Sequence, residues 1–100
     1  MYRATTPTHI FTLPFDTDQL EKIRITYAQF GETIFQKNET QCTLIGKTIK
    51  VELTQEETLR FQSTAEVSIQ LRVMTKDGKV MASEILQKQP KECLDEEVLA

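Results

Sequence analysis

Apolar and polar side chains alternate one by one along most of this chain, which is the period of a β-strand with one buried face. The pattern is clearest from Glu66 to Thr75, where Val, Ile and Leu take every second position. The other predicted strands are Thr8 to Leu13, Glu21 to Gln29, Thr33 to Lys37, Gln41 to Ile45 and Thr48 to Leu53. Turn residues separate these stretches about every eight to twelve positions. The chain is therefore predicted to consist mostly of short antiparallel strands.

The Asp77-Gly78 pair follows the clearest strand and is a strong hairpin signal. A two-residue turn here pairs Thr75 with Val80 and carries Glu84 into the buried row of the next strand. A buried carboxylate without a partner is costly. We therefore favour a bulge near residues 83–84 that swings Ile85 inward, over a Glu84 that stays at the rim of the sheet.

One stretch departs from the strand pattern. Thr54 followed three residues later by Glu57 is a capping box, which satisfies the free amides at a helix start. It predicts one helical or 3₁₀ turn near residues 55–60, with Phe61 as a plug where the chain reaches the next sheet. Short strands without long crossover helices predict an all-β, antiparallel two-sheet sandwich of immunoglobulin type. A small barrel is the alternative.

Composition agrees with an all-β fold. Ile, Val and Thr number 27, whereas Ala numbers five, and residues branched at the β-carbon favour strands. We expect one domain over residues 1–100, because no linker or repeat interrupts the chain.

The charge of the chain is concentrated at its C-terminal end. Residues 1–90 hold 11 basic and 11 acidic side chains, so the net charge of −3 belongs to residues 91–100. A body without a broad positive field is a poor nucleic-acid binder, and no nucleic-acid partner is expected. We expect the acidic segment to be an appendage, formed as a helical turn or an edge strand that packs through Leu94, Val98 and Leu99.

No membrane partner is expected either. No apolar run exceeds three residues, so neither a transmembrane segment nor a signal peptide is predicted, and synthesis in the cytoplasm is the expectation. Cys42 and Cys93 lie 51 positions apart without nearby ligand residues. We expect two free thiols, and a disulfide only if the C-terminal segment folds back beside Cys42.

Residues with the spacing of a catalytic or metal site are not found. His9 is the one histidine, and no serine lies in a Gly-x-Ser-x-Gly context. Asp16 and Asp18 fit an Asx-type turn better than a calcium site. We therefore predict a non-enzymatic protein, with no catalytic, cofactor-binding or metal-binding residues.

Three aromatic residues lie outside the inward rows of the strands. Tyr2, Phe15 and Phe30 are candidate partner contacts, although Phe15 and Phe30 would instead cap the two ends of the core. A free edge strand offers a second means of contact, with other subunits or in a weak homo-oligomer. Binding of carbohydrate or a host surface is the alternative function, but this chain has no Trp and two Tyr.

Several stretches resemble a group of small phage and prophage proteins from Gram-positive, largely clostridial, gut bacteria. They are Thr6-Pro7-Thr8-His9-Ile10-Phe11, Ile25-Thr26-Tyr27-Ala28-Gln29, Leu53-Thr54-Gln55-Glu56-Glu57-Thr58-Leu59, Ile69-Gln70-Leu71-Arg72-Val73, Ala82-Ser83-Glu84-Ile85 and the ending Cys93-Leu94-Asp95-Glu96-Glu97-Val98-Leu99. The resemblance covers nearly the whole chain. It implies a tail, baseplate or head-associated component of a phage particle, with an immunoglobulin-like module as the fold analogy. It implies no catalytic residues.

Overall fold

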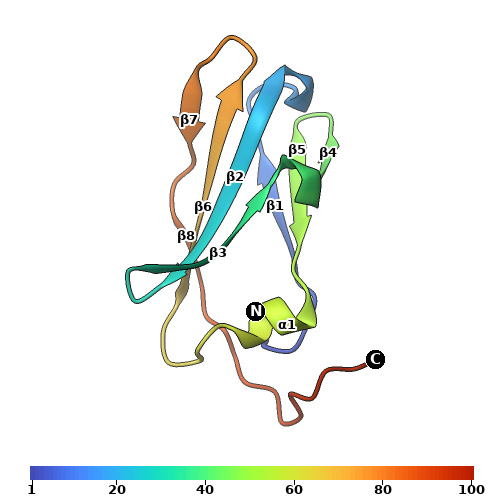
Figure 1. Cartoon of the computed structure of the whole chain (residues 1–100), viewed down its shortest axis with the longest axis vertical. Coiled ribbons are helices and arrows are strands. Elements are labelled where there is room, and N and C mark those ends of the chain that lie inside the picture. The colour runs from blue at the N-terminus through green and yellow to red at the C-terminus, as the bar shows by residue number, and fades with distance from the viewer.

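The computed structural model describes residues 1–100, which form two antiparallel sheets packed face to face (Figure 1). The first sheet has the order β1-β5-β4, with β1 at Thr8–Thr12, β4 at Cys42–Ile45 and β5 at Thr48–Glu52. The second has the order β3-β2-β6-β7, and β8 also pairs with β6; its strands are β2 at Leu20–Gln29, β3 at Glu32–Asn38, β6 at Val67–Thr75, β7 at Val80–Ala82 and β8 at Leu86–Lys88. The helical elements are η1 at Thr17–Gln19, η2 at Glu39–Gln41 and α1 at Gln55–Leu59.

The strand order is that of an immunoglobulin-type sandwich. In the letters used for that fold, β1, β5 and β4 take the places of strands B, E and D. Strands β3, β2, β6 and β7 take the places of C′, C, F and G. The helix α1 connects E to F at the same end of the sandwich as both chain termini (Figure 1). The predicted sandwich is confirmed, and the barrel alternative is wrong because no strand pair joins the two sheets.

The core is made by the inward rows of the strands, as the alternating pattern predicts. Thirteen buried hydrophobic residues form one cluster between the sheets. The largest share comes from β2 and β6, which pair along almost their whole length. The buried hydrophobic side chains of these two strands are Leu20, Ile23, Ile25 and Tyr27 of β2 and Val67, Ile69, Leu71 and Val73 of β6.

The buried ring of Tyr27 links the two sheets. Its hydroxyl lies 2.8 Å from Nδ1 of His9, which faces it from β1 in the other sheet. Its ring stacks on Phe35 and Phe61, with centroids 4.8 and 6.0 Å away. A phenol group buried in a core needs a hydrogen-bond partner, and here the opposite sheet supplies it.

The predicted helical turn is confirmed. The side chain of Thr54 accepts a hydrogen bond from the amide of Glu57 at 3.1 Å, and the Glu57 carboxylate accepts one from the amide of Thr54 at 2.8 Å. This is the reciprocal capping box that the sequence predicts. Phe61 follows with no exposed surface, so it is the expected plug at the end of the core.

The β6–β7 hairpin differs from the prediction by one residue. The Thr75 amide donates to the carbonyl of Lys79 at 2.8 Å, and Met74 pairs with Val80. The predicted pair of Thr75 with Val80 is therefore wrong. The loop has three residues, Lys76-Asp77-Gly78, and ends with the glycine at a φ of +88°. A glycine in this conformation closes a type I turn with a bulge, so Asp-Gly occupies the last two of three loop positions.

This shift explains what happens after β7. Ser83 now lies opposite Leu71, and its amide donates to the Leu71 carbonyl at 2.8 Å. The ladder then breaks and resumes in β8 with a register shifted by one residue, so the irregularity predicted near residues 83–84 is present. The expectation that Ile85 turns inward is wrong, because Ile85 is 55% exposed. Glu84 does not fall opposite the core, so no inward swing is needed.

The acidic segment 91–100 forms neither the expected helical turn nor a strand, apart from one parallel bridge between Lys91 and Tyr2. Packing through Leu94, Val98 and Leu99 is also wrong, since all three are exposed and Leu94 is fully so. Polar contacts hold the segment instead. The Gln55 side chain exchanges two hydrogen bonds, each of 2.9 Å, with the backbone of Leu99.

Arg3 makes the central contact of this arrangement. Its guanidinium donates to the carbonyls of Phe61 and Leu59 at 2.8 and 3.2 Å, at the C-terminal end of α1. A third donor lies 2.6 Å from the carboxylate of Glu96. The Cys93 thiol also donates to the Arg3 carbonyl at 3.2 Å. One side chain therefore joins the N-terminal residues, α1 and the acidic segment.

We predict that Arg3→Ala loosens residues 92–100 and lowers the free energy of unfolding by about 2 kcal/mol, because three charge-assisted hydrogen bonds are lost. Hydrogen exchange followed by mass spectrometry should show loss of protection in the C-terminal peptide. Arg24→Ala, which removes an exposed arginine from the outer face of β2, is the matched control. An unchanged exchange rate at residues 92–100 in Arg3→Ala would contradict this role.

Candidate interaction site

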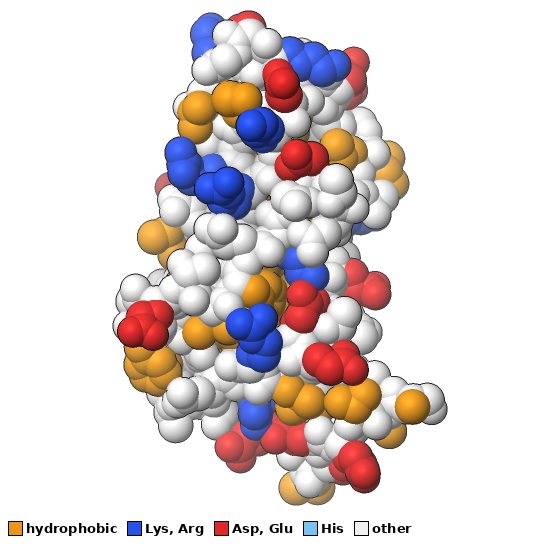
Figure 2. Space-filling model, viewed as in Figure 1, with side chains coloured by type: hydrophobic (Ala, Val, Ile, Leu, Met, Phe, Trp, Pro, Cys, Tyr) orange, Lys and Arg blue, Asp and Glu red, His pale blue; other side chains and the backbone are white.

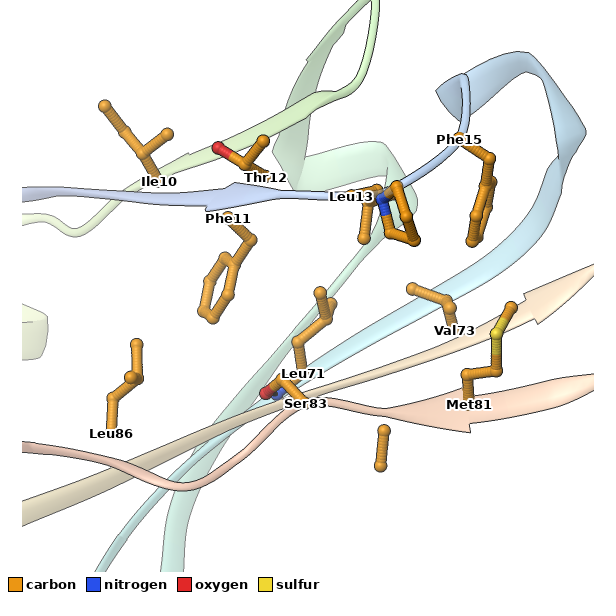
Figure 3. Close-up of a pocket in the computed structure, with 12 residues that line it drawn as sticks. Ile10, Phe11, Thr12, Leu13, Phe15, Leu71, Val73, Met81, Ser83 and Leu86 are labelled. Atoms are coloured by element: carbon orange, nitrogen blue, oxygen red, sulfur yellow. Dashed lines mark hydrogen bonds between the residues drawn. The ribbon is translucent and has the colours of Figure 1, made fainter.

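An apolar groove opens between the two sheets, along β1 on one side and along β7 and β8 on the other (Figure 3). It has a volume of about 440 Å³, and none of its twelve lining residues is charged. We call it the β1 groove. Its walls are Phe11, Leu13 and Phe15 on one side and Leu71, Met81 and Leu86 on the other.

The groove is open because both strands that border it have a free edge. β1 pairs only with β5, and β7 pairs only with β6. In the immunoglobulin order, strand A lies beside strand B, which is β1 here. Residues 1–7 do not take that place, since Tyr2 bridges to Lys91 and Arg3 is held at α1. The edge of β1 is therefore left without a neighbouring strand.

The free edge of β1 is unusual in its chemistry. Edge strands of soluble proteins usually carry charges, prolines or bulges that discourage pairing, whereas β1 reads Thr-His-Ile-Phe-Thr. The amide of Leu13 donates to the Lys47 carbonyl of the neighbouring hairpin. Backbone groups alternate along an antiparallel strand, so those of Thr8, Ile10 and Thr12 point to the free side. The Ile10 side chain is 56% exposed.

The other strand edges are less suited to pairing. β3 carries Glu32 and Lys37 and has a register irregularity where it pairs with β2. β4 and β7 have only four and three residues. β1 thus presents the longest uncharged edge of the sandwich.

The three predicted contact residues are not brought together. Tyr2 is 52% exposed, with the Lys91 ammonium 5.6 Å from its ring centroid, and Phe30 is 63% exposed. Phe15 is half-buried, packs on the core and lines the β1 groove. Phe15 precedes β2 and Phe30 follows it, so a strand of ten residues separates them. Capping of the core is therefore observed at Phe15 and not at Phe30.

Sequence reasoning named Phe15 as a contact residue but missed Ile10 and Met81, which also line the groove. The outward row of β1 is Thr8, Ile10 and Thr12. The apolar Ile10 in this otherwise polar row was the one sequence signal of a contact surface on β1. Met81 was hidden by the register error in the β6–β7 hairpin, which placed Val80 and Ala82 inward instead. Leu86 lies opposite Ile69, as the predicted register implies.

A second hollow lies on the outer face of β2 and β6, where Figure 2 shows basic side chains gathered with acidic ones between them. Lys22, Arg24 and Arg72 line it, and the two arginines are direct cross-strand neighbours. Glu39 lies beside them. Hydrogen bonds from its own backbone amide and from that of Ile23, followed by the charges of Lys22 and Arg24, lower the pKa of this carboxyl. The basic cluster is thus partly compensated.

The buried polar side chains serve the fold. Burial, followed by the charges of Lys88 and the N-terminus, lowers the pKa of His9 from 6.5 to about 4. Burial raises the pKa of Tyr27 far above its usual range. No acidic group is hydrogen-bonded to the imidazole, as a catalytic triad requires.

A partly buried ion pair lies near the same aromatic rings. The Lys37 ammonium is 2.5 Å from the Glu57 carboxylate. Burial raises the pKa of Glu57, but hydrogen bonds from Lys37 and Thr54 outweigh it, so the net pKa is lowered. The ion pair thus joins the capping box of α1 to β3.

The remaining candidates have plain structural settings. Asp16 accepts a hydrogen bond from the amide of Asp18 at 3.0 Å, which is the predicted Asx-type turn. Cys42 and Cys93 are free thiols, as predicted. The structure has no group of three or more His, Cys, Asp or Glu side chains placed to hold a metal ion. None of its helices has the length and apolar character needed to cross a membrane.

Comparisons with known proteins assign no family to the chain. No protein-family model, curated protein or solved structure matches it.

We predict that the lowered pKa of His9 makes the protein less stable in acid. Between the folded pKa of about 4 and the ordinary value of 6.5, the unfolded chain binds more protons, so stability falls as pH decreases through this window. The loss reaches about 3 kcal/mol near pH 4. Denaturant unfolding between pH 7 and 4 measures it.

His9→Gln is the matched variant, because glutamine is polar but does not titrate. Its free energy of unfolding should change less between pH 6.5 and 5 than that of the original protein. Equal slopes in the two proteins would show that His9 does not cause the effect.

Proposed function

We propose that this chain is a non-enzymatic interaction module that assembles with other subunits through the free edge of β1. The observation that carries the proposal is the uncharged edge strand beside the open β1 groove. Adding a strand to such an edge is a common mode of protein recognition. Every buried polar side-chain atom already has a hydrogen-bond partner within the chain.

The mechanism follows from strand geometry. The backbone groups of Thr8, Ile10 and Thr12 supply the hydrogen bonds, which give affinity without selecting a sequence. Alternate side chains of an added strand point toward the groove, where Phe11 and Met81 form apolar walls. Selectivity then comes from the size and apolar character of those side chains.

The resemblance to phage and prophage proteins supports a particular setting. We place the module in a tail, baseplate or head-associated assembly of a phage or prophage particle. The chain is similar in kind to the immunoglobulin-like modules that decorate phage virions. This similarity is an analogy of fold.

Mass spectrometry of purified particles, produced by inducing the bacterium that encodes the chain, tests this setting. We expect the chain in the particles, with Ile10→Lys reducing its incorporation at least tenfold because a charge is placed on the pairing edge. Ile45→Lys at the edge of β4 is the control, since Ile45 is equally exposed. Expression in the cell together with complete absence from particles would refute the proposal.

Phe30 supports the alternative function, binding of carbohydrate or a host surface. It lies with Gly31 in the turn between β2 and β3, at a φ of +54° that is strained for a large side chain. The turn presents the ring to solvent. A glycan array should show specific binding that Phe30→Ala abolishes and Phe30→Tyr retains. Absence of binding to any glycan would count against this alternative.

A further inference from the structure

We infer that the partner of the β1 edge is a second copy of this chain, paired antiparallel about a two-fold axis at Ile10. This inference deepens the proposed function by naming the partner of the same site. A two-fold axis needs a surface that is complementary to itself. The free edge of β1 has that property in sequence, in backbone direction and in charge.

The sequence of β1 is nearly symmetric about its centre. Antiparallel pairing at Ile10 places Thr8 opposite Thr12 of the second copy and Ile10 opposite its own counterpart. His9 then lies opposite Phe11. Threonine pairs and branched apolar pairs are favourable across antiparallel strands, and no charged side chain is among them.

The backbone supports the same register. Since the peptide groups of Thr8, Ile10 and Thr12 face the free side, each of the three facing pairs can exchange two hydrogen bonds. The contact would contain about six backbone hydrogen bonds and would join two three-stranded sheets into one of six strands. The second copy would then cover the exposed Ile10 side chain and the unpaired backbone groups of the β1 edge.

Charge does not oppose the approach of two copies. No residue lining the β1 groove is charged. The net charge of −3 belongs to residues 91–100, which lie at the α1 end of the sandwich (Figure 1). The nearest charge on the same face is Lys50 of β5, opposite Ile10. Three strand spacings, roughly 14 Å, separate it from the Lys50 of the second copy, which exceeds the screening length at physiological salt.

The size of the contact predicts a weak and reversible dimer. The paired strand has five residues in each copy, whereas a stable interface of standard size uses about 20–30 residues on each side. We therefore expect a dissociation constant in the range of roughly 1–100 μM, typical of contacts at the small end of the scale.

Sedimentation velocity of the purified chain from about 1 μM to 1 mM tests the dimer. We expect a concentration-dependent shift from monomer to dimer. Ile10→Lys should weaken association at least tenfold, because two ammonium groups would face each other across the axis. Ile45→Lys, the control at the β4 edge, should leave the dimer unchanged. Circular dichroism confirms that each variant is folded.

Cysteine pairs test the register. In a Cys42→Ser, Cys93→Ser background, Ile10→Cys should form a disulfide-linked dimer on mild oxidation, because facing Cα atoms lie about 5.5 Å apart. Thr8→Cys alone should not cross-link, but a mixture of Thr8→Cys and Thr12→Cys chains should. Equal cross-linking of Thr8→Cys alone would overturn the register.

Two results would overturn the pairing itself: a strict monomer at 1 mM protein, or a dimer that Ile10→Lys leaves unchanged. A strict monomer that still enters particles would refute the second copy as partner and favour a strand of another protein, while the proposed function would stand. A dimer that is absent from particles would refute the phage setting and leave the pairing intact.

Discussion

The hydrogen bond between Tyr27 and His9 is the contact on which the arrangement of the sandwich depends. It joins the central strand of one sheet to an edge strand of the other, at 2.8 Å and away from solvent. Both polar groups would be costly to bury alone, and each is satisfied by the other. The immunoglobulin order often uses a disulfide and a buried tryptophan at this level. Here a phenol, an imidazole and the stacked ring of Phe35 occupy the space between the sheets.

The same contact fixes the position of β1, and one side of this strand stays open. β1 is held inward by His9 and Phe11 and sideways by β5. On the other side the residues that precede it cannot serve as a neighbouring strand, because Arg3 anchors them to α1. The open groove and the firm attachment of the termini are therefore two consequences of one arrangement. A site for strand addition arises without any special motif in the sequence.

Local patterns predicted most of the fold. The alternation in β6 and the capping box of Thr54 and Glu57 depend on near neighbours along the chain, and both were predicted correctly. The hairpin after β6 was predicted at the right place with the wrong loop length, because Asp-Gly fits either a two-residue or a three-residue loop. That single residue changed which side chains of β7 face inward. Because of this error, the sequence did not predict that Met81 forms part of the groove wall.

The sequence alone determined the all-β class, the inward rows and the turns, because these depend on periodicity and on the conformational preferences of neighbouring residues. Only the tertiary structure decided which strand edge stays free and where the acidic segment lies. Arg3 and Glu96 meet although 93 positions separate them, and no periodicity encodes such a contact. The candidate site likewise exists because no neighbouring strand covers the free edge of β1. An uncovered edge becomes visible only when every strand has been assigned its neighbours.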